Sequence, residues 1–203
     1  MNLFKLAAAA VVGAATSFAA YAGGHVKPAV VYDMGGKFDK SFNAGVYTGV
    51  KKFTDETGIE VMEFEVTSET QREQALRRFA QRGATIVLGV GFAQADAIAK
   101  VAAEFPDTKF SIIDVTWLDA PNIRQYGFKE EEGSYLVGVA AAMASKTGKV
   151  GFVGGMDIPL IRHFACGYVQ GVKATNPDAE IFQNMTGSTP SAWNDPAKGA
   201  ELA

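Results

Sequence analysis

The stretch "TIVLGVGFAQADAIAKVAAEFPDTKFSIID", residues 85–114, decides the fold class. It opens with an apolar run typical of a buried strand and then passes two glycines. Ile98, Val101 and Phe105 follow at spacings of three and four, which predicts an amphipathic helix. The closing "KFSIID" predicts the next strand. Because parallel strands need such a crossover, the stretch predicts part of a parallel α/β sheet.

The same alternation extends toward the N-terminus. Val46, Val50 and Phe53 share one face of a predicted helix, and Leu76 and Phe79 point inward in a second helix whose arginines are expected to face water. Further strands are predicted at "PAVVYD" (28–33), "IEVMEFEV" (59–66) and "IRQYGF" (123–128). We therefore expect a first α/β lobe over residues 23–128, with parallel strands covered by helices on both faces.

The pattern restarts near Phe128 to Glu131. The segment 130–148 predicts a helix that begins with acidic residues, which suit its N-terminal dipole, and ends at Gly148. The sequence after this helix predicts a strand at 149–155, a helix at 159–173 and a strand at 179–185. These elements predict a second α/β lobe over residues 129–203. Asp195 and Pro196 predict the start of another helix, where the sequence stops, so we interpret this lobe as incomplete and the chain as a fragment.

Residues 1–22 have the order of a secretory signal peptide: Lys5, an alanine-rich apolar run, and "AYA" before Gly23. The single cysteine, Cys166, lies far from that site, so we expect no direct lipid anchor and no internal disulfide. A formal net charge of −3 lacks the basic footprint of a nucleic-acid-binding protein. We expect an exported, periplasmic protein with no nucleic-acid partner.

Ligands of open α/β sheets bind outside the carboxyl ends of the strands. The segments that follow predicted strands are 33–43, 89–92, 114–117, 128–130 and 154–159. These segments converge only if the two lobes face each other. The predicted binding place is therefore a cleft between the lobes.

The first of these segments, "DMGGKFDKSFN" (33–43), lacks the glycine spacing of a nucleotide-hydrolysing phosphate loop. Its glycine pair permits unusual backbone angles, and Ser41 or Asn43 is a candidate cap for the following helix. Phe42 has two interpretations. A large ring at a helix start either covers the core or stacks on a ligand.

The segment "GVGFAQA" (89–95) is similar to a dinucleotide fingerprint, and Asp114 lies where a ribose-binding acid would stand. Gln94 replaces the third glycine, however, and the motif follows the third predicted strand instead of the first. A nicotinamide-dependent Rossmann enzyme is therefore an alternative that we rank below a binding protein. We expect no cofactor.

Several other side chains have both a structural and a functional interpretation. Asp33 and Asp114 either form strand-end turns or accept hydrogen bonds from a ligand; as a pair they also suit acid–base chemistry. His163 and Cys166 share a helix face, but two ligands make a poor metal site, so we expect no metal. Trp193, in the polar segment "TPSAWNDP", is either a lid over a cleft or a surface cover.

Taken together, five stretches resemble the basic membrane protein family, the PnrA-like solute-binding proteins of ABC importers. They are "DMGGKFDKSFNAG", "VLGVGFAQADAIAKVAAEFPDTKFSIID", "PNIRQYGFKEEEGSYLVGVAAAMASKTGKVGFVGG", "IPLIRHFACGY" and "TPSAWNDPAKGAELA". The resemblance implies a type I periplasmic-binding fold, in which two α/β lobes are joined by three crossings. Members of this family are usually longer than this chain.

The resemblance also implies a site and partners. Asp33, Phe42 and Asn43 would line a ligand cleft with Phe42 stacked on a purine, and Asp114 would accept a hydrogen bond. The further candidates for ligand contact are Gly91, Phe92 and Trp193. It implies a purine nucleoside or nucleobase as ligand, riboflavin being another possibility, and an ABC permease of the inner membrane as partner. A ligand sensor for a signalling protein is the alternative.

Overall fold

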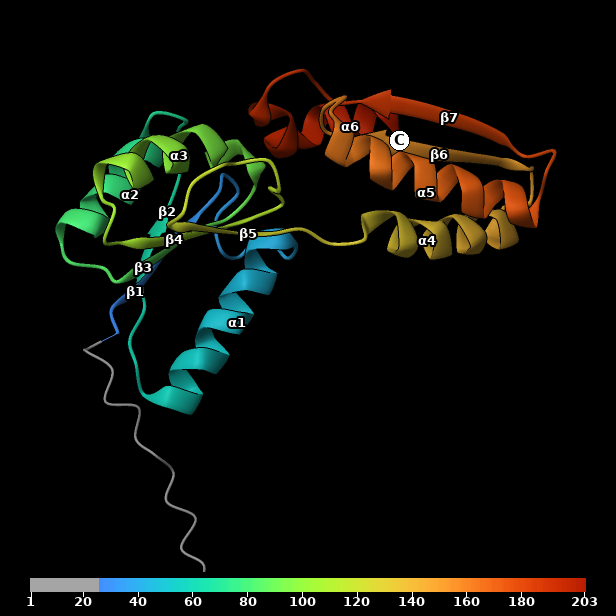
Figure 1. The fold of residues 1–203 in the computed structure, drawn as a ribbon. Helices are drawn as coiled ribbons and strands as arrows, with labels where there is room; N and C mark the ends of the chain where they lie inside the picture. Colours follow the sequence, from blue (N-terminus) through green and yellow to red (C-terminus); the bar gives the residue numbers. More distant parts are fainter. Residues whose placement is uncertain (1–25) are drawn as a thin grey trace, which may run out of the picture.

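The computed structural model describes residues 26–203; the predicted signal peptide and its cleavage site lie outside the described residues. Figure 1 shows two α/β units, each with a sheet of its own, and the chain crosses from one to the other between β5 and α4. We call them the first and second lobes. Their predicted boundary at residues 128 and 129 stays a prediction. Among residues 26–203, no helix is both long and apolar enough to cross a membrane.

The first lobe is built on a five-stranded sheet in the order β2-β1-β3-β4-β5, with every neighbouring pair parallel. Its strands are β1 (Pro28–Tyr32), β2 (Met62–Glu65), β3 (Ile86–Gly89), β4 (Lys109–Ile113) and β5 (Ile123–Tyr126). From β1 the chain adds β2 on one side of the sheet and then β3, β4 and β5 on the other, so the strand order changes direction between β1 and β3. Such a switch point leaves a crevice at the carboxyl ends of the two strands, where open α/β sheets bind ligands.

Helices cover both faces of this sheet, as the sequence predicted (Figure 1). They are α1 (Phe42–Thr57), α2 (Gln71–Gln81) and α3 (Ala95–Glu104), the last preceded by a 3-10 turn, η1 (Phe92–Gln94). Side chains alternate along each strand. Val31 of β1 therefore packs in the larger core with α2 and α3, while Val30 and Tyr32 pack toward α1.

The second lobe contains a two-stranded parallel sheet and three helices. Its elements are α4 (Glu130–Ala144), β6 (Lys149–Gly154), α5 (Pro159–Thr175), β7 (Glu180–Met185), η2 (Pro190–Asn194) and α6 (Pro196–Leu202). Glycines bring α4 and α5 together, because a Cβ at Gly138 or Gly171 would strike the backbone of Tyr168 or Tyr135 on the facing helix. The first turns of α5 lie beside the first lobe (Figure 1).

Two local predictions need correction and one is confirmed. The helix predicted over 130–148 ends at Ala144, and Gly148, with φ +73°, belongs to the turn before β6. Arg72 was expected to face water with the other arginines of α2, yet it is buried. The predicted cap of the last helix is present, because the Asp195 carboxylate accepts a hydrogen bond from the backbone of Lys198 at 2.9 Å.

Candidate ligand-binding site

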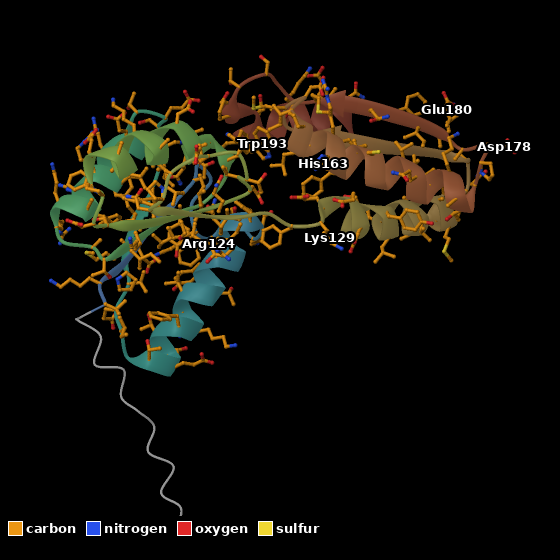
Figure 2. The ribbon with its side chains drawn as sticks, viewed as in Figure 1. Arg124, Lys129, His163, Asp178, Glu180 and Trp193 are labelled. Atoms are coloured by element: carbon orange, nitrogen blue, oxygen red, sulfur yellow. The ribbon has the colours of Figure 1, made fainter. Side chains whose placement is uncertain are left out.

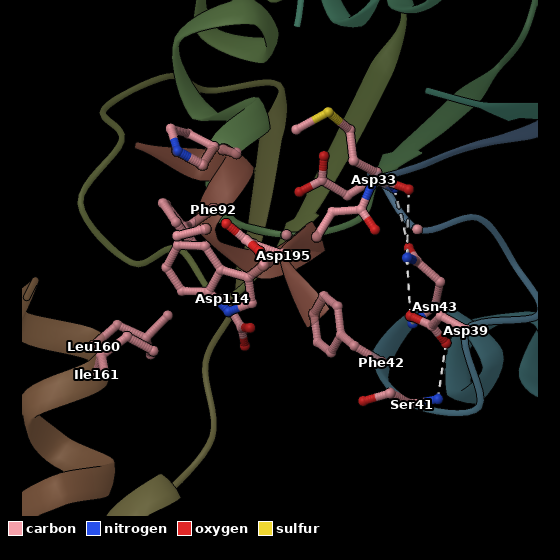
Figure 3. A pocket seen from close by; sticks show the side chains of 18 of the residues that line it. Asp33, Asp39, Ser41, Phe42, Asn43, Phe92, Asp114, Leu160, Ile161 and Asp195 are labelled. Atoms are coloured by element: carbon pink, nitrogen blue, oxygen red, sulfur yellow. Dashed lines mark hydrogen bonds between the residues drawn. The ribbon is translucent and has the colours of Figure 1, made fainter. Parts of the chain in front are cut away.

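A cavity of about 670 Å³ lies between the two lobes, at the carboxyl ends of β1, β3 and β4. Its volume falls in the range of small-molecule sites. In Figure 3 the first lobe supplies Asp33, Phe42 and Asp114, and α5 closes the opposite side with Leu160 and Ile161. The complete lining is Asp33, Met34, Gly35, Asp39, Ser41, Phe42, Asn43, Gly91, Phe92, Ala93, Asp114, Leu160, Ile161, Phe164, Pro190, Ala192, Trp193, Asn194, Asp195 and Pro196.

Asp33 is the first residue after β1 and is fixed through both its backbone and its side chain. Its backbone N–H donates to Oδ1 of Asn43 at 3.0 Å. Its carboxylate forms an ion pair with the buried Arg72, whose Nη2 lies 3.0 Å from Oδ1. Asp33 is therefore a rigid acceptor at the switch point between β1 and β3.

Asn43 braces the start of α1 against the end of β1 (Figure 3). Its side chain is 2% exposed, and its Nδ2 donates to Oδ2 of Asp39 at 3.1 Å and to the backbone oxygen of Asp33 at 3.4 Å. The expectation that Asn43 contacts the ligand stays a prediction. Its geometry assigns the amide first to holding Asp33 in place.

Ser41, one of the two cap residues that the sequence predicted, is the N-cap residue of α1, but its side chain makes no capping hydrogen bond. The side chain that caps the helix start belongs to Asp39. Its carboxylate accepts backbone hydrogen bonds from Ser41, Asn43 and Ala44 at 2.8, 3.1 and 3.0 Å. Burial raises the pKa of Asp39, but these backbone donors outweigh burial and lower it. The role of Asp39 was not predicted because a folded turn, 33–39, brings this acid back onto the helix start, which residue spacing alone does not show.

Gly91 lies close to both the ring of Phe42 and the carboxylate of Asp33. Phe42 is 38% exposed and lines the cavity from the first turn of α1. Gly91 has φ +92°, and a Cβ there would stand 3.2 Å from Oδ2 of Asp33 and 3.6 Å from Cε1 of Phe42. A side chain at position 91 would thus contact both the ring and the carboxylate.

Asp114 follows β4 and has the left-handed backbone angle φ +66°. Burial, with a smaller contribution from the charge of Glu130, raises the pKa of Asp114 to about 6. No hydrogen bond to its carboxylate comes from residues 26–203. Backbone strain and an unpaired, partly buried acid occur together most often at functional sites. The carboxylate of Asp114 is consequently an acceptor in this cavity that has no partner among residues 26–203.

Phe92 and Trp193 meet across the gap between the lobes. Their ring centroids are 5.1 Å apart at an interplanar angle of 64°, an edge-to-face contact. Figure 2 shows Trp193 on the side of the second lobe that faces the first. A Cβ on Gly155 would clash with the indole, so the absence of a side chain at this glycine leaves room for the ring. Of its two sequence interpretations, this geometry favours the lid over the surface cover.

The dinucleotide interpretation fails at Gln94. This side chain is fully buried, and its Nε2 donates to the backbone oxygens of Val31 at 2.8 Å and Val90 at 3.1 Å. It therefore ties the ends of β1 and β3 together. The fingerprint requires a small residue at this position for close packing of the helix on the strand, and a bridging glutamine cannot serve that purpose.

Sequence reasoning missed the contribution of α5 to the cavity. Leu160, Ile161 and Phe164 line it from the first turns of that helix. The apolar pattern of the segment was visible, but which of its faces meets the first lobe depends on how the lobes are placed. No signal within the sequence gives that placement.

The predicted absence of a metal stays a prediction. The sulfur of Cys166 accepts a hydrogen bond from Nε2 of Gln170 on its own helix. A ring nitrogen of His163 lies within 4.8 Å of carboxylate oxygens of Glu130 and Glu131, outside the cavity lining. Both acids lie in the first turn of α4, where a negative charge interacts favourably with the helix dipole. Their presence therefore has an explanation that needs no metal ion.

Residues 26–203 match the family described as ABC transporter substrate-binding protein PnrA-like. The "ABC transporter nucleoside-binding protein BmpA" of Lactococcus lactis is 33% identical over 182 residues, which are 88% of this chain and 51% of that protein. The "CD4+ T-cell-stimulating antigen" of Listeria monocytogenes is 39% identical over 158 residues, 75% of this chain and 44% of that protein. The chain thus spans about half the length of these curated relatives.

Solved structures agree with the sequence relatives. An ABC transporter solute-binding protein from Aeropyrum pernix has a TM-score of 0.74 and 30% identity, covering 87% of this chain and 52% of that one. A second, from Conexibacter woesei, has a TM-score of 0.64 at 30% identity, covering 88% of this chain and 59% of that one. The two-lobed α/β architecture is that of periplasmic binding proteins, as predicted, and the chain belongs to the PnrA-like, or basic membrane protein, family of ABC transporter substrate-binding proteins.

Proposed function

We propose that this protein is an extracytoplasmic receptor that captures a purine nucleoside or a related nucleobase and delivers it to an ABC permease. The observation that carries the proposal is the lining of the cavity, where the half-exposed ring of Phe42 stands with the carboxylates of Asp33 and Asp114. A purine offers flat faces to such a ring and N–H or hydroxyl donors to such acids.

Aromatic stacking and hydrogen bonding to a carboxylate each contribute enough free energy to affect ligand binding measurably. Stacking of a base on an aromatic side chain contributes about 1–3 kcal/mol. Hydrogen bonds to a charged acceptor are about twice as strong as those between neutral groups. The name of the Lactococcus lactis relative, a nucleoside-binding protein, supports the same ligand class.

Delivery follows from the two-lobed architecture. The cavity takes its walls from both lobes, and Phe92 meets Trp193 across the gap. A ligand that contacts both walls favours the closed arrangement over the open one, and hinge closure of this kind signals occupancy to a partner. The predicted signal peptide supports a periplasmic location, where the receptor would meet the permease.

Calorimetry of the full-length mature protein tests the proposal. The ligands are adenosine, guanosine, inosine, adenine and riboflavin, with NAD⁺ added to test the nicotinamide alternative. We expect micromolar or tighter binding of at least one purine and no binding of NAD⁺. Binding of riboflavin alone, or of none of these compounds, would remove the purine assignment.

Phe42→Ala provides the matched variant. We expect it to weaken purine binding more than tenfold, by about 1.4 kcal/mol or more, while the melting temperature stays nearly unchanged. Phe38→Ala is the control, because Phe38 is 69% exposed and does not line the cavity. Equal loss of binding and melting temperature in Phe42→Ala would mean that the ring belongs to the core.

A further inference from the structure

Arg72 is an unusual residue of α2, because it is charged and only 5% exposed. Its neighbour Arg77 behaves as surface arginines do and pairs with Glu73 and Glu104 at the protein surface. Arginine is almost never fully buried without a partner, and burying a charge is costly. Arg72 does not itself line the cavity.

The partner of Arg72 is a single oxygen of Asp33. Its Nε and Nη2 donate to Oδ1 of Asp33 at 3.3 and 3.0 Å. Neither distance involves Oδ2, so the usual side-by-side pairing with both carboxylate oxygens is absent here. The arginine therefore occupies one oxygen and leaves the other free.

The free oxygen points to the cavity. Oδ2 of Asp33 lies 3.2 Å from the position that a Cβ of Gly91 would take, and Phe42 stands on the far side of that position. Asn43 holds the backbone of Asp33 at the same time. Rotation of the carboxylate would break the contact with Arg72, so the orientation of Oδ2 is set from outside the cavity.

We propose that Arg72 is a positioning residue that fixes Asp33 to accept one hydrogen bond from the ligand and so selects for a donor group at that point. An ionised carboxylate accepts hydrogen bonds and donates none. The ligand group that meets Oδ2 is thus a hydroxyl or a ring N–H, and a carbonyl or an unprotonated ring nitrogen is rejected. This inference rests on the proposed capture of a purine nucleoside.

Analogues that each lack one donor test the inference. Inosine, 2′-deoxyinosine, 3′-deoxyinosine, 5′-deoxyinosine and 1-methylinosine are titrated into the full-length mature wild type and into Arg72→Met, Arg72→Lys and Asp33→Asn. Arg78→Met is the matched control, because Arg78 is an exposed arginine of the same helix. Thermal melts of each variant report the effect on the fold.

We expect one analogue to bind the wild type at least tenfold more weakly than inosine. In Arg72→Met and Asp33→Asn, the ratio of inosine affinity to the affinity for this analogue should fall below threefold. Arg72→Lys should give an intermediate ratio, because lysine keeps the positive charge but lacks the planar guanidinium group. Arg78→Met should retain the wild-type ratio. If Arg72→Met does not fold, Arg72→Lys decides the question.

Two results would overturn the inference. One is a uniform loss of affinity for all five compounds in Arg72→Met and Arg72→Lys, which indicates a structural role only. The other is a wild type that discriminates against none of the analogues, which shows that Asp33 receives no donor from this ligand.

A measurement without ligand separates this inference from the proposed function. Should inosine not bind the wild type, the Nε–H signal of Arg72 is followed by nuclear magnetic resonance in the full-length mature protein. A slowly exchanging signal that is lost in Asp33→Asn supports the fixed pair, although the purine assignment has then failed. A rapidly exchanging signal in the wild type overturns the positioning role.

Discussion

The strained, unpaired Asp114 leads to a prediction about pH. Burial raises its pKa to about 6 in the free protein, whereas a ligand that donates hydrogen bonds to the carboxylate requires the ionised form. Below pH 6, ligand binding must therefore displace a proton. Affinity should fall about tenfold for each pH unit below 6, which makes binding at pH 5 about tenfold weaker than at pH 7.

Calorimetry with adenosine, which keeps its charge over this range, measures the effect at pH 5, 6, 7 and 8. Repeating the titration at pH 6 in buffers of different ionisation enthalpy should show release of about half a proton per ligand bound. Asp114→Asn should remove the slope and lower the affinity at pH 7 about fivefold, because a neutral acceptor is weaker by about 1 kcal/mol. Asparagine also tolerates the left-handed angle that residue 114 adopts.

The stability of the free protein should change in the opposite direction. A pKa raised by folding means that the contribution of Asp114 to stability is fully present below pH 3.8 and is lost as the pH rises through about 6. At pH 7 the ionised acid therefore destabilises the free protein by at most about 3 kcal/mol, and Asp114→Asn should raise its melting temperature.

Asp119→Asn is the control, since Asp119 is an exposed acid of the same loop. It should change neither the affinity nor its pH dependence. A flat profile in the wild type, or the same slope in Asp114→Asn, would show that Asp114 does not bind the ligand in its ionised form. Stronger binding at pH 5 than at pH 7 would show that Asp114 donates its proton to the ligand.

Three further variants test the walls of the cavity. Gly91→Ala should abolish detectable purine binding by calorimetry, whereas Gly83→Ala, which has a similar φ of +77° but open space around it, should lower the melting temperature alone. Gly155→Ala should displace the indole of Trp193, change its fluorescence and weaken binding several-fold. Asn43→Ala leaves buried groups without partners and should lower the free energy of unfolding in urea by about 1–3 kcal/mol, together with the affinity.

The alternation of apolar runs made the architecture predictable, since strands and amphipathic helices follow from residue period. The strand ends were predictable for the same reason, so the sequence was enough to indicate Asp33 and Asp114 as candidate site residues. Arg72 was not predictable. Its position after Thr70 and Gln71 looks like an exposed helix start, and only the pairing of β1 with its neighbours brings Asp33 over it.

Helix α5 shows a second kind of limit. Its apolar face is evident from the sequence, but the same pattern serves a helix packed on its own sheet or one that also closes a cavity. Tyr168 and Val172 pack on the sheet of the second lobe, while Leu160 and Phe164 near the helix start face the first lobe. The choice between these two roles depends on how α5 contacts the first lobe, and the local pattern of apolar residues does not predict that contact.

Asp33 and Asp114, two of the four acids that line the cavity, are held by opposite means, and the difference bears on how the protein would signal that it holds a ligand. Asp33 already has a partner in Arg72, so its charge is offset before the ligand arrives. Asp114 has none among the described residues and is partly buried, so we expect a donor from the ligand to offset the cost of burying its charge. A ligand shifts a conformational equilibrium only by its differential affinity for the two states. We therefore expect a ligand contact at Asp114 to favour the closed arrangement, where water is excluded, and a contact at Asp33 mainly to set the orientation of the ligand.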